Sequence, residues 1–315
     1  MPRLAWPFLV ALIGCGSDPA EIAAPADPGT EPREPVPYLP EFDIEGASPT
    51  LTNDDVAIEI ESRFADLVIA VPTGFPELFD QMMTLAEPGC PEVTNTSDGS
   101  RTALFVRGEC TTSGGASFRG SIDYAYDAGF VDGTALISGM EMFAQDLRIE
   151  SADGRFLEAD GFFSFNHVED GASATASSYC TGRLRADDAS AGRDPWLGGE
   201  VEGLVSVFVG DFGGYRIANI NATVATDDPD IAGINMQDLR WEPGQCDIEM
   251  MGTGSIREAS GVWHDVIFAV RTDDAGAIGC DGCGDHLAGG SPQDDPVCNT
   301  DALDTLVDFS GGLPW

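Results

Sequence analysis

The chain of 315 residues contains no lysine, and all 15 of its basic residues are arginine. This absence excludes a Schiff-base lysine, a P-loop lysine on a phosphate and a Ser-Lys dyad. Against these 15 bases stand 54 acidic residues, which give a formal net charge of −39. A surface this acidic repels phosphate backbones, so the composition excludes nucleic acid as a partner and disfavours direct adsorption to an anionic membrane.

Histidine is also scarce, with only His167, His264 and His286 in the sequence. Neither a G-x-S-x-G elbow nor an H-E-x-x-H zinc motif occurs. His264 stands beside Asp265, but adjacent side chains of a strand point to opposite faces, so these two do not form a base and its orienter. The sequence therefore assigns no catalytic residue and favours a protein that is not an enzyme.

The sequence has no apolar run long enough to span a bilayer as a helix, which takes about 20 residues. Arg3 and the short apolar stretch from Leu4 to Ile13 are typical of an export signal. The run LIGC that ends at Cys15 resembles the lipobox of bacterial lipoproteins. The resemblance implies that residues 1–14 are removed, that Cys15 is lipidated and, because Gly16 is not aspartate, that the protein lies at the outer membrane or cell surface. The alternatives are a plain signal peptide with a chance cysteine, or an apolar strand.

Residues 15–50 are predicted to be a lipid anchor followed by a disordered, acidic, proline-rich tether. Eight of the 20 prolines of the chain fall between Pro19 and Pro49, without a helical or strand period. Such a composition favours extended polyproline II and indicates a spacer. A docking motif for a proline-reading partner is the alternative.

Residues 51–89 are predicted to form a helical pair. Apolar residues recur at helical spacing in TNDDVAIEIESRFADLVIAV, from Val56 through Ile60 and Phe64, and Thr52 or Asn53 can cap this helix. A second helix is expected in FPELFDQMMTLAEPG. Its methionines Met82 and Met83 are typical of core residues.

Residues 90–315 are predicted to form a disulfide-bonded β domain with a cysteine-rich C-terminal loop region. Alternating and β-branched segments are interrupted by Gly- and Asp-rich turns roughly every 8 to 12 residues. The fold class is therefore mainly β, a long antiparallel meander closed as a sandwich or barrel or rolled on itself. The tetrapeptide QDLR occurs at Gln145–Arg148 and at Gln237–Arg240. A match this short is weak evidence for duplication.

Eight cysteines occur, and the assignment of Cys15 to lipid leaves seven. Export implies an oxidising compartment, in which bridges are expected. The spacing and the loop-like surroundings favour the pairs Cys90–Cys110, Cys246–Cys280 and Cys283–Cys298, with Cys180 free and buried. The alternatives are a zinc site made of Cys280, Cys283, His286 and Cys298, or a redox-active C-x-x-C. The sequence around CDGCG resembles the C-terminal ends of uncharacterised, cysteine-containing bacterial surface lipoproteins, which implies no activity.

The excess of acid has two readings, solubility or calcium binding. The calcium candidates are Asp227, Asp228 and Asp230 in TDDPD, and Asp273 and Asp274 in RTDDAG, although neither stretch matches an EF-hand loop. Beyond calcium, no cofactor or metal is predicted.

Taken as a whole, the sequence predicts an exported, lipid-anchored cell-surface or periplasmic binding or structural module. Its partners would be the membrane, through the anchor, and a protein or polysaccharide ligand. One alternative is a hydrolase acting on envelope or extracellular polysaccharide, whose paired carboxylates cannot be selected among 54 acids. Another is a calcium-dependent adhesion-type module. The tryptophans are expected in the core, with stacking on sugar rings as the alternative for Trp196, Trp241, Trp263 and Trp315.

Overall fold

The computed structural model describes the part of the chain that follows the predicted tether. The predicted signal peptide, Cys15 and most of the proline-rich segment lie outside the described residues, as does the end of the chain beyond residue 299. The described residues are 47–69, 75–97, 101–132, 135–171, 173–187, 200–212, 216–226, 228–243, 246–268, 270–272, 276–278 and 280–299.

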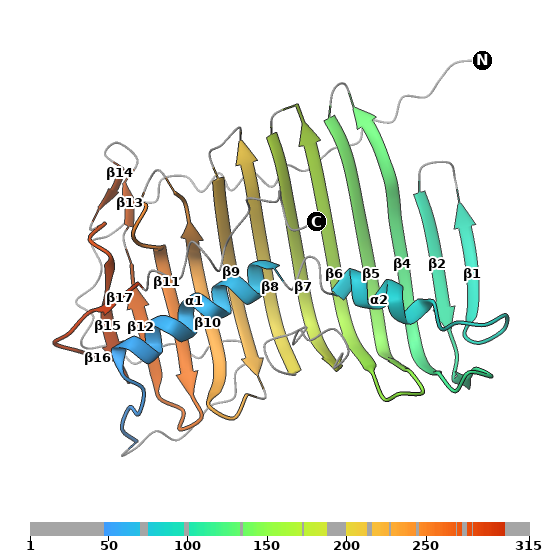
Figure 1. The fold of residues 1–315 in the computed structure, drawn as a ribbon, viewed down its shortest axis with the longest axis horizontal. Helices are drawn as coiled ribbons and strands as arrows, with labels where there is room; N and C mark the ends of the chain where they lie inside the picture. Colours follow the sequence, from blue (N-terminus) through green and yellow to red (C-terminus); the bar gives the residue numbers. More distant parts are fainter. Residues whose placement is uncertain are drawn as a thin grey trace.

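A single large antiparallel sheet of 15 strands dominates the fold. Its strands follow one another in the order β1-β2-β4-β5-β6-β7-β8-β9-β10-β11-β12-β15-β16, with β3 beside β4 and β17 beside β15. This is the predicted mainly β meander. The sheet is open, with β1 and β16 at the two ends of the described path, so it is neither a sandwich nor a closed barrel (Figure 1).

The longest strands of the large sheet are β4 to β7. In chain order they are β1 Glu92–Ser97, β2 Arg101–Arg107, β3 Cys110–Thr111, β4 Ser117–Asp132, β5 Ala135–Glu150, β6 Phe156–Asp170, β7 Ser173–Asp187, β8 Glu200–Phe212, β9 Arg216–Thr226, β10 Ile231–Trp241, β11 Met251–Glu258, β12 Trp263–Ile267, β15 Cys283–Ala288, β16 Ser291–Pro292 and β17 Val297–Cys298. A separate hairpin is formed by β13 Val270–Thr272 and β14 Gly276–Ile278.

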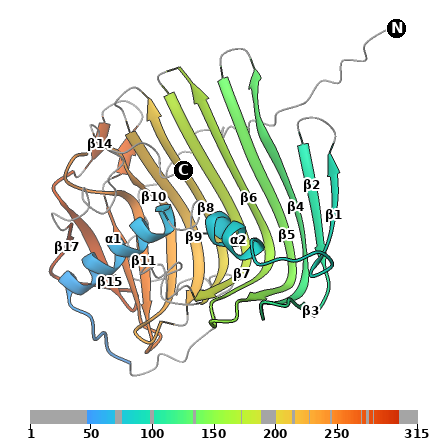
Figure 2. The ribbon, with the colours of Figure 1, turned by 45° about the vertical axis from the view of Figure 1, so that its right-hand side comes forward.

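The two predicted helices, α1 Asn53–Ile69 and α2 Phe75–Met83, both lie on one face of this sheet, which we call the covered face (Figures 1 and 2). They share one hydrophobic core with the strands, so the helical pair and the sheet form one unit. Each fully buried Leu, Ile or Phe side chain contributes about 1.5–3 kcal/mol. The predicted stripe of α1 is buried: Val56, Ile60, Phe64, Leu67 and Val68.

The start of α1 is fixed by a capping box. The Asp55 amide donates to the Thr52 hydroxyl oxygen at 3.2 Å, and the Thr52 amide donates to the Asp55 carboxylate at 3.0 Å. The hydrogen bonds from the side chain and backbone of Thr52 lower the pKa of Asp55. Thr52 is therefore the cap, whereas Asn53 donates to the carbonyl oxygens of Asp295 and Pro296 at 2.8 and 3.0 Å.

The QDLR repeat marks two equivalent β-bulges. Asp146 in β5 and Asp238 in β10 both adopt φ 47°, and each breaks the ladder register. Each faces a glycine, because a Cβ on Gly120 or Gly252 would lie 2.2 or 2.3 Å from the aspartate carbonyl oxygen. The strand that carries the facing glycine precedes the motif in the first bulge, where β4 comes before β5. It follows the motif in the second bulge, where β11 comes after β10. A tandem duplication would preserve that order, so the two bulges do not support a duplication.

Candidate functional site

The described cysteines form three disulfides, Cys90–Cys110, Cys246–Cys280 and Cys283–Cys298. These are the three pairs expected from the sequence. Of the described cysteines, Cys180 is free and buried in β7, as predicted, and burial raises the pKa of its thiol. Disulfides of this kind are typical of proteins that mature in an oxidising, exported environment.

The alternative zinc site is not formed. Its three proposed cysteine ligands are divided between two disulfides, and its fourth proposed ligand, His286, contacts His264. Sulfurs that are bonded to one another cannot act as thiolate ligands. The same pairing rules out the C-x-x-C reading, because Cys280 and Cys283 belong to different bridges.

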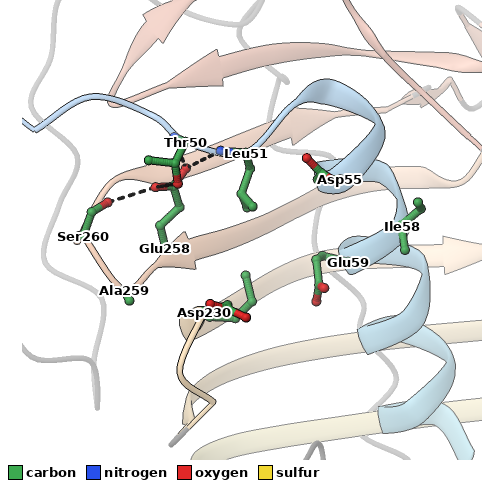
Figure 3. A pocket seen from close by; sticks show the side chains of 10 residues that line it. Thr50, Leu51, Asp55, Ile58, Glu59, Asp230, Glu258, Ala259 and Ser260 are labelled. Carbon is green, nitrogen blue, oxygen red and sulfur yellow. Dashed lines mark hydrogen bonds between the residues drawn. The ribbon is translucent and has the colours of Figure 1, made fainter.

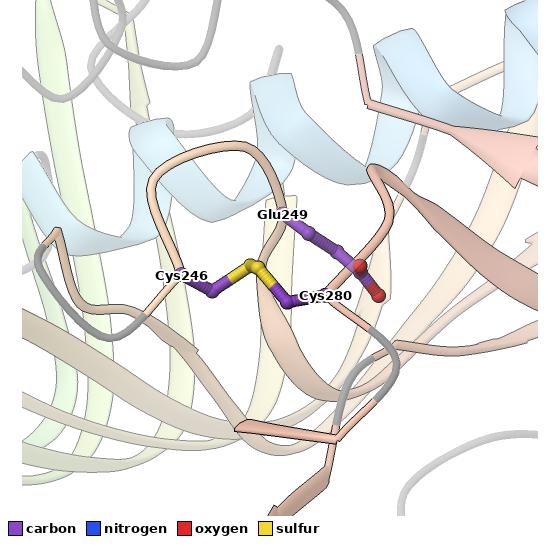
Figure 4. A group of neighbouring side chains, drawn as sticks. All are labelled: Cys246, Glu249 and Cys280. Atoms are coloured by element: carbon purple, nitrogen blue, oxygen red, sulfur yellow. A yellow bond between two sulfur atoms is a disulfide. The ribbon is translucent and has the colours of Figure 1, made fainter. Parts of the chain in front are cut away.

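One acidic side chain lies against a disulfide. The Glu249 carboxylate lies within 4.8 Å of the sulfurs of Cys246 and Cys280 and is buried (Figure 4). It accepts hydrogen bonds from the amides of Asp281 and Gly282 at 3.0 and 3.1 Å. The carboxylate therefore fixes the backbone of the loop between the two C-terminal bridges.

A second buried carboxylate, that of Glu258 at the end of β11, binds the residues where the described chain begins. One oxygen, Oε1, accepts from the amides of Thr50 and Leu51 at 2.8 and 3.0 Å. The other, Oε2, accepts from the hydroxyls of Thr50 and Ser260 at 2.8 and 3.0 Å. Figure 3 shows this carboxylate between the entering chain and the turn after β11.

Glu258 is also the first member of a buried chain of three ionisable side chains. Its Oε1 lies 2.7 Å from Nε2 of His264, whose Nδ1 lies 3.0 Å from Nε2 of His286. An ionised carboxylate only accepts, so Nε2 of His264 donates to Glu258, and the two rings share one hydrogen bond between Nδ1 of His264 and Nε2 of His286. The remaining nitrogen, Nδ1 of His286, is buried without a hydrogen-bond partner.

The protonation states follow from this geometry. Burial alone would raise the pKa of Glu258, but the hydrogen bonds from Leu51, Thr50 and His264 lower it to about 2. Burial lowers the pKa of His286, and so does its neighbour His264, while Asp265 opposes the shift. Near neutral pH Glu258 is therefore a carboxylate and His286 a neutral imidazole.

An open pocket of about 260 Å³ adjoins this network (Figure 3). Its wall includes the carboxyl groups of Asp55, Glu59, Asp230 and Glu258. Neither His264 nor His286 lines it, so a histidine base of the network does not face a molecule bound there.

The calcium candidates are only partly described. Asp227, Asp273 and Asp274 lie outside the described residues. Asp228 forms an ion pair with Arg63 of α1 and accepts from the amides of Asp230 and Ile231 at 2.9 and 3.2 Å. Burial would raise the pKa of Asp228, but these contacts lower it. The carboxylate thus fastens α1 to the turn before β10, while Asp230 is exposed at the pocket.

The tryptophans expected in the core lie as follows. Trp241 is buried, and Trp263 is half-buried with the Arg257 guanidinium 5.6 Å from its ring centre. Trp196 and Trp315 lie outside the described residues.

Comparisons of the chain with protein-family models, with curated proteins and with solved structures gave no significant match. Within the described residues, no helix is both long enough and apolar enough to cross a membrane.

Sequence reasoning missed the Glu258 network. His264 and His286 stood out because histidine is rare, but Glu258 is one of 54 acids. Its partners Thr50 and Leu51 are more than 200 residues away, at separations of 208 and 207. No local pattern could identify it.

Proposed function

We propose that this protein is an exported, lipid-anchored binding module at the bacterial outer membrane or cell surface, with Cys15 as the lipidated residue. The observation that carries the proposal is the attachment of Thr50 and Leu51 to the buried Glu258 carboxylate. The tether predicted between Cys15 and residue 50 would therefore enter the fold at one fixed, buried point. A membrane-tethered domain requires such an attachment, because any load on the tether acts there first.

Three further features support export and tethering. The three disulfides fit an oxidising compartment. The LIGC run before a polar, proline-rich segment fits a lipobox, and two or three acyl chains make attachment effectively stable. The roughly 25 residues from Gly16 to Pro40 would reach about 80 Å as polyproline II, at about 3.1 Å per residue.

The hydrolase alternative has less support. The pocket beside Glu258 has carboxylates on its wall, but its lining contains no tryptophan that could stack on a sugar. Glu258 itself accepts five hydrogen bonds and is held ionised, so it lacks the raised pKa of a general acid. A calcium-dependent module is also less supported, because the Asp228 carboxylate is bound by Arg63.

The test is the intact mass of the protein made in a bacterium that processes lipoproteins, beside a Cys15→Ala variant. We expect the wild-type protein to lose residues 1–14 and to gain three acyl chains, and the variant to show neither change. A wild-type product that keeps residues 1–14, or that is cut but carries no lipid, would overturn the anchor.

A further inference from the structure

The second face of the central sheet, which we call the open face, carries neither α1 nor α2 (Figures 1 and 2). The burial pattern separates the two faces: in β8 the buried Val205, Val207 and Val209 point to the covered face, so Leu204, Ser206 and Phe208 point to the open one. A soluble sheet face is normally polar where no other layer covers it. The aromatic residues on this face therefore need an explanation.

These aromatic residues form a diagonal ridge across four neighbouring strands, which we call the aromatic ridge: Phe143, Phe162, Tyr179 and Phe208. Phe143 pairs directly with Phe162 in the ladder between β5 and β6. Tyr179 pairs with Ser164, two residues beyond Phe162, and its ring centre lies 6.4 Å from that of Phe162. Phe208 of β8 pairs with Ser177, one further step along the same diagonal.

The ridge is exposed and elongated. Phe143 and Tyr179 are 46% and 40% exposed, values unusual for aromatic rings in the middle of a sheet. With strands about 4.8 Å apart and a rise of about 3.4 Å per residue, the ridge extends over about 20 Å. This length suits an extended polymer better than a compact small molecule.

The groups beside the ridge are hydroxyls. Ser164 and Ser206 pair with Tyr179 from its two neighbouring strands, and Thr181 pairs with Phe162. All three are partly exposed. Rings alternating with hydroxyls match a sugar chain, whose C–H faces stack on rings while its hydroxyls exchange hydrogen bonds.

Several charges on the open face are paired with a charge of opposite sign. Arg107 pairs with Asp123, and Arg148 and Arg185 both pair with Glu158. The chain as a whole carries −39. A polyanion is repelled by that field, a polycation is attracted to the acidic surface in general, and a second copy adds its own −39. The partner whose charge best suits a face with these paired charges, on a chain this acidic, is an uncharged polymer.

We propose that the aromatic ridge binds an uncharged polysaccharide laid across strands β5 to β8. The proposal rests on the proposed function as a binding module and names the class of its ligand. It uses the open face of the sheet, whereas the Glu258 network and its pocket lie at the turn after β11.

The experiment is affinity electrophoresis of the folded chain from residue 16 in native gels containing hydroxyethylcellulose, dextran or galactomannan, with alginate as an anionic polymer. We expect at least one neutral polymer to retard the wild-type protein and alginate to have no effect. The double variant F143A/Y179A should bind that polymer about tenfold or more weakly, because each stacked ring contributes on the order of 1 kcal/mol.

Matched variants separate stacking from general stickiness. Phe143→Leu keeps an apolar side chain without a ring and should weaken retardation, whereas Tyr179→Phe keeps the ring and should retain it. Ile58→Ala, on α1 at the covered face, removes a side chain of similar exposure, 53%, and should have no effect. Unchanged far-ultraviolet circular dichroism and melting temperature exclude unfolding as the cause.

Three results would overturn the proposal: no retardation by any neutral polymer, retardation unchanged in F143A/Y179A, or self-association that disappears in that variant. The last would assign the ridge to a second copy. The protein used in the binding experiment starts after Cys15, so a negative binding result leaves the proposed lipid anchor untouched. In the same way, a protein that carries no lipid in the mass experiment leaves the binding result untouched.

Discussion

Replacing Glu258 with glutamine removes one buried charge and keeps the shape of the side chain. The amide oxygen can still accept from Thr50, Leu51 and His264, and the amide nitrogen can donate to the hydroxyls of Thr50 and Ser260 once these rotate. The variant therefore measures what the negative charge contributes to holding the entering chain. It does so without creating a cavity.

The magnitude follows from the pKa of Glu258, which is about 2 in the folded protein against an ordinary value of 4.5. One pKa unit corresponds to 1.36 kcal/mol, so the charged carboxylate stabilises the fold by about 3 kcal/mol. Because the folded pKa lies below the unfolded one, this contribution is fully present above pH 4.5. It is lost as the pH falls from about 4.5 to about 2.

The assay is urea unfolding followed by tryptophan fluorescence at several pH values between 2 and 7, with the disulfides intact. We expect Glu258→Gln to be about 3 kcal/mol less stable than wild type at pH 7, and the difference to shrink towards pH 2. Glu202→Gln, at an exposed glutamate of β8, is the control and should give only a small difference at pH 7. A loss of stability in Glu258→Gln that is equal at pH 7 and pH 2 would refute the reasoning.

Three further predictions concern other parts of the fold. Burial lowers the pKa of His286, so the unfolded chain takes up the proton at a higher pH than the folded protein, and the free energy of unfolding should fall as the pH drops below about 6.5. In His286→Gln the free energy of unfolding should depend less on pH in that range. An equally steep pH dependence in the variant and the wild type would contradict this. Cys180 should resist alkylation under native conditions and react once urea unfolds the protein, as mass spectrometry can follow, because its thiol is buried and its pKa raised. Gly120→Ala should lower the free energy of unfolding by about 2–4 kcal/mol, because the new Cβ would lie 2.2 Å from the Asp146 carbonyl oxygen. The control is Gly154→Ala, whose Cβ meets nothing within 4 Å and which should cost about 1 kcal/mol. Equal losses of stability in the two variants would show that the bulge tolerates the Cβ.

The sequence predicted the elements that local periodicity specifies. The apolar stripe of α1 and its cap at Thr52 could be read directly, as could the strands, because alternation and turn residues are local signals. The disulfide pairs were accessible for a similar reason: Cys90 and Cys110 are close in the chain, and the C-terminal cysteines cluster in short loops. Each of these features depends on near neighbours.

Local signals could not predict whether the sheet is open or closed. Alternation in a strand such as β6 shows that one face is buried, but not what buries it. A second sheet, a barrel interior and a pair of helices all give the same pattern. Here α1 and α2 fill the covered face, so the sheet stays open. The QDLR bulges show the same limit, since each depends on a glycine in a neighbouring strand.

Backbone amides hold both of the fully buried carboxylates described above. The Glu258 carboxylate accepts hydrogen bonds from the amides of Thr50 and Leu51. The Glu249 carboxylate accepts hydrogen bonds from the amides of loop residues 281 and 282. Fixed N–H dipoles around a buried charge are screened far less by salt than exposed ion pairs. The entering chain and the C-terminal loop should therefore stay attached over a wide range of ionic strength.

The position of the Glu258 attachment also bears on binding. Thr50 and Leu51 contact Glu258 at the turn after β11, while the aromatic ridge crosses β5 to β8 on the open face, with β9 and β10 between them. A polymer on the ridge would then approach from the side of the sheet away from the entering chain. The contacts that hold Thr50 and Leu51 and the proposed polymer site therefore use different surfaces of the sheet.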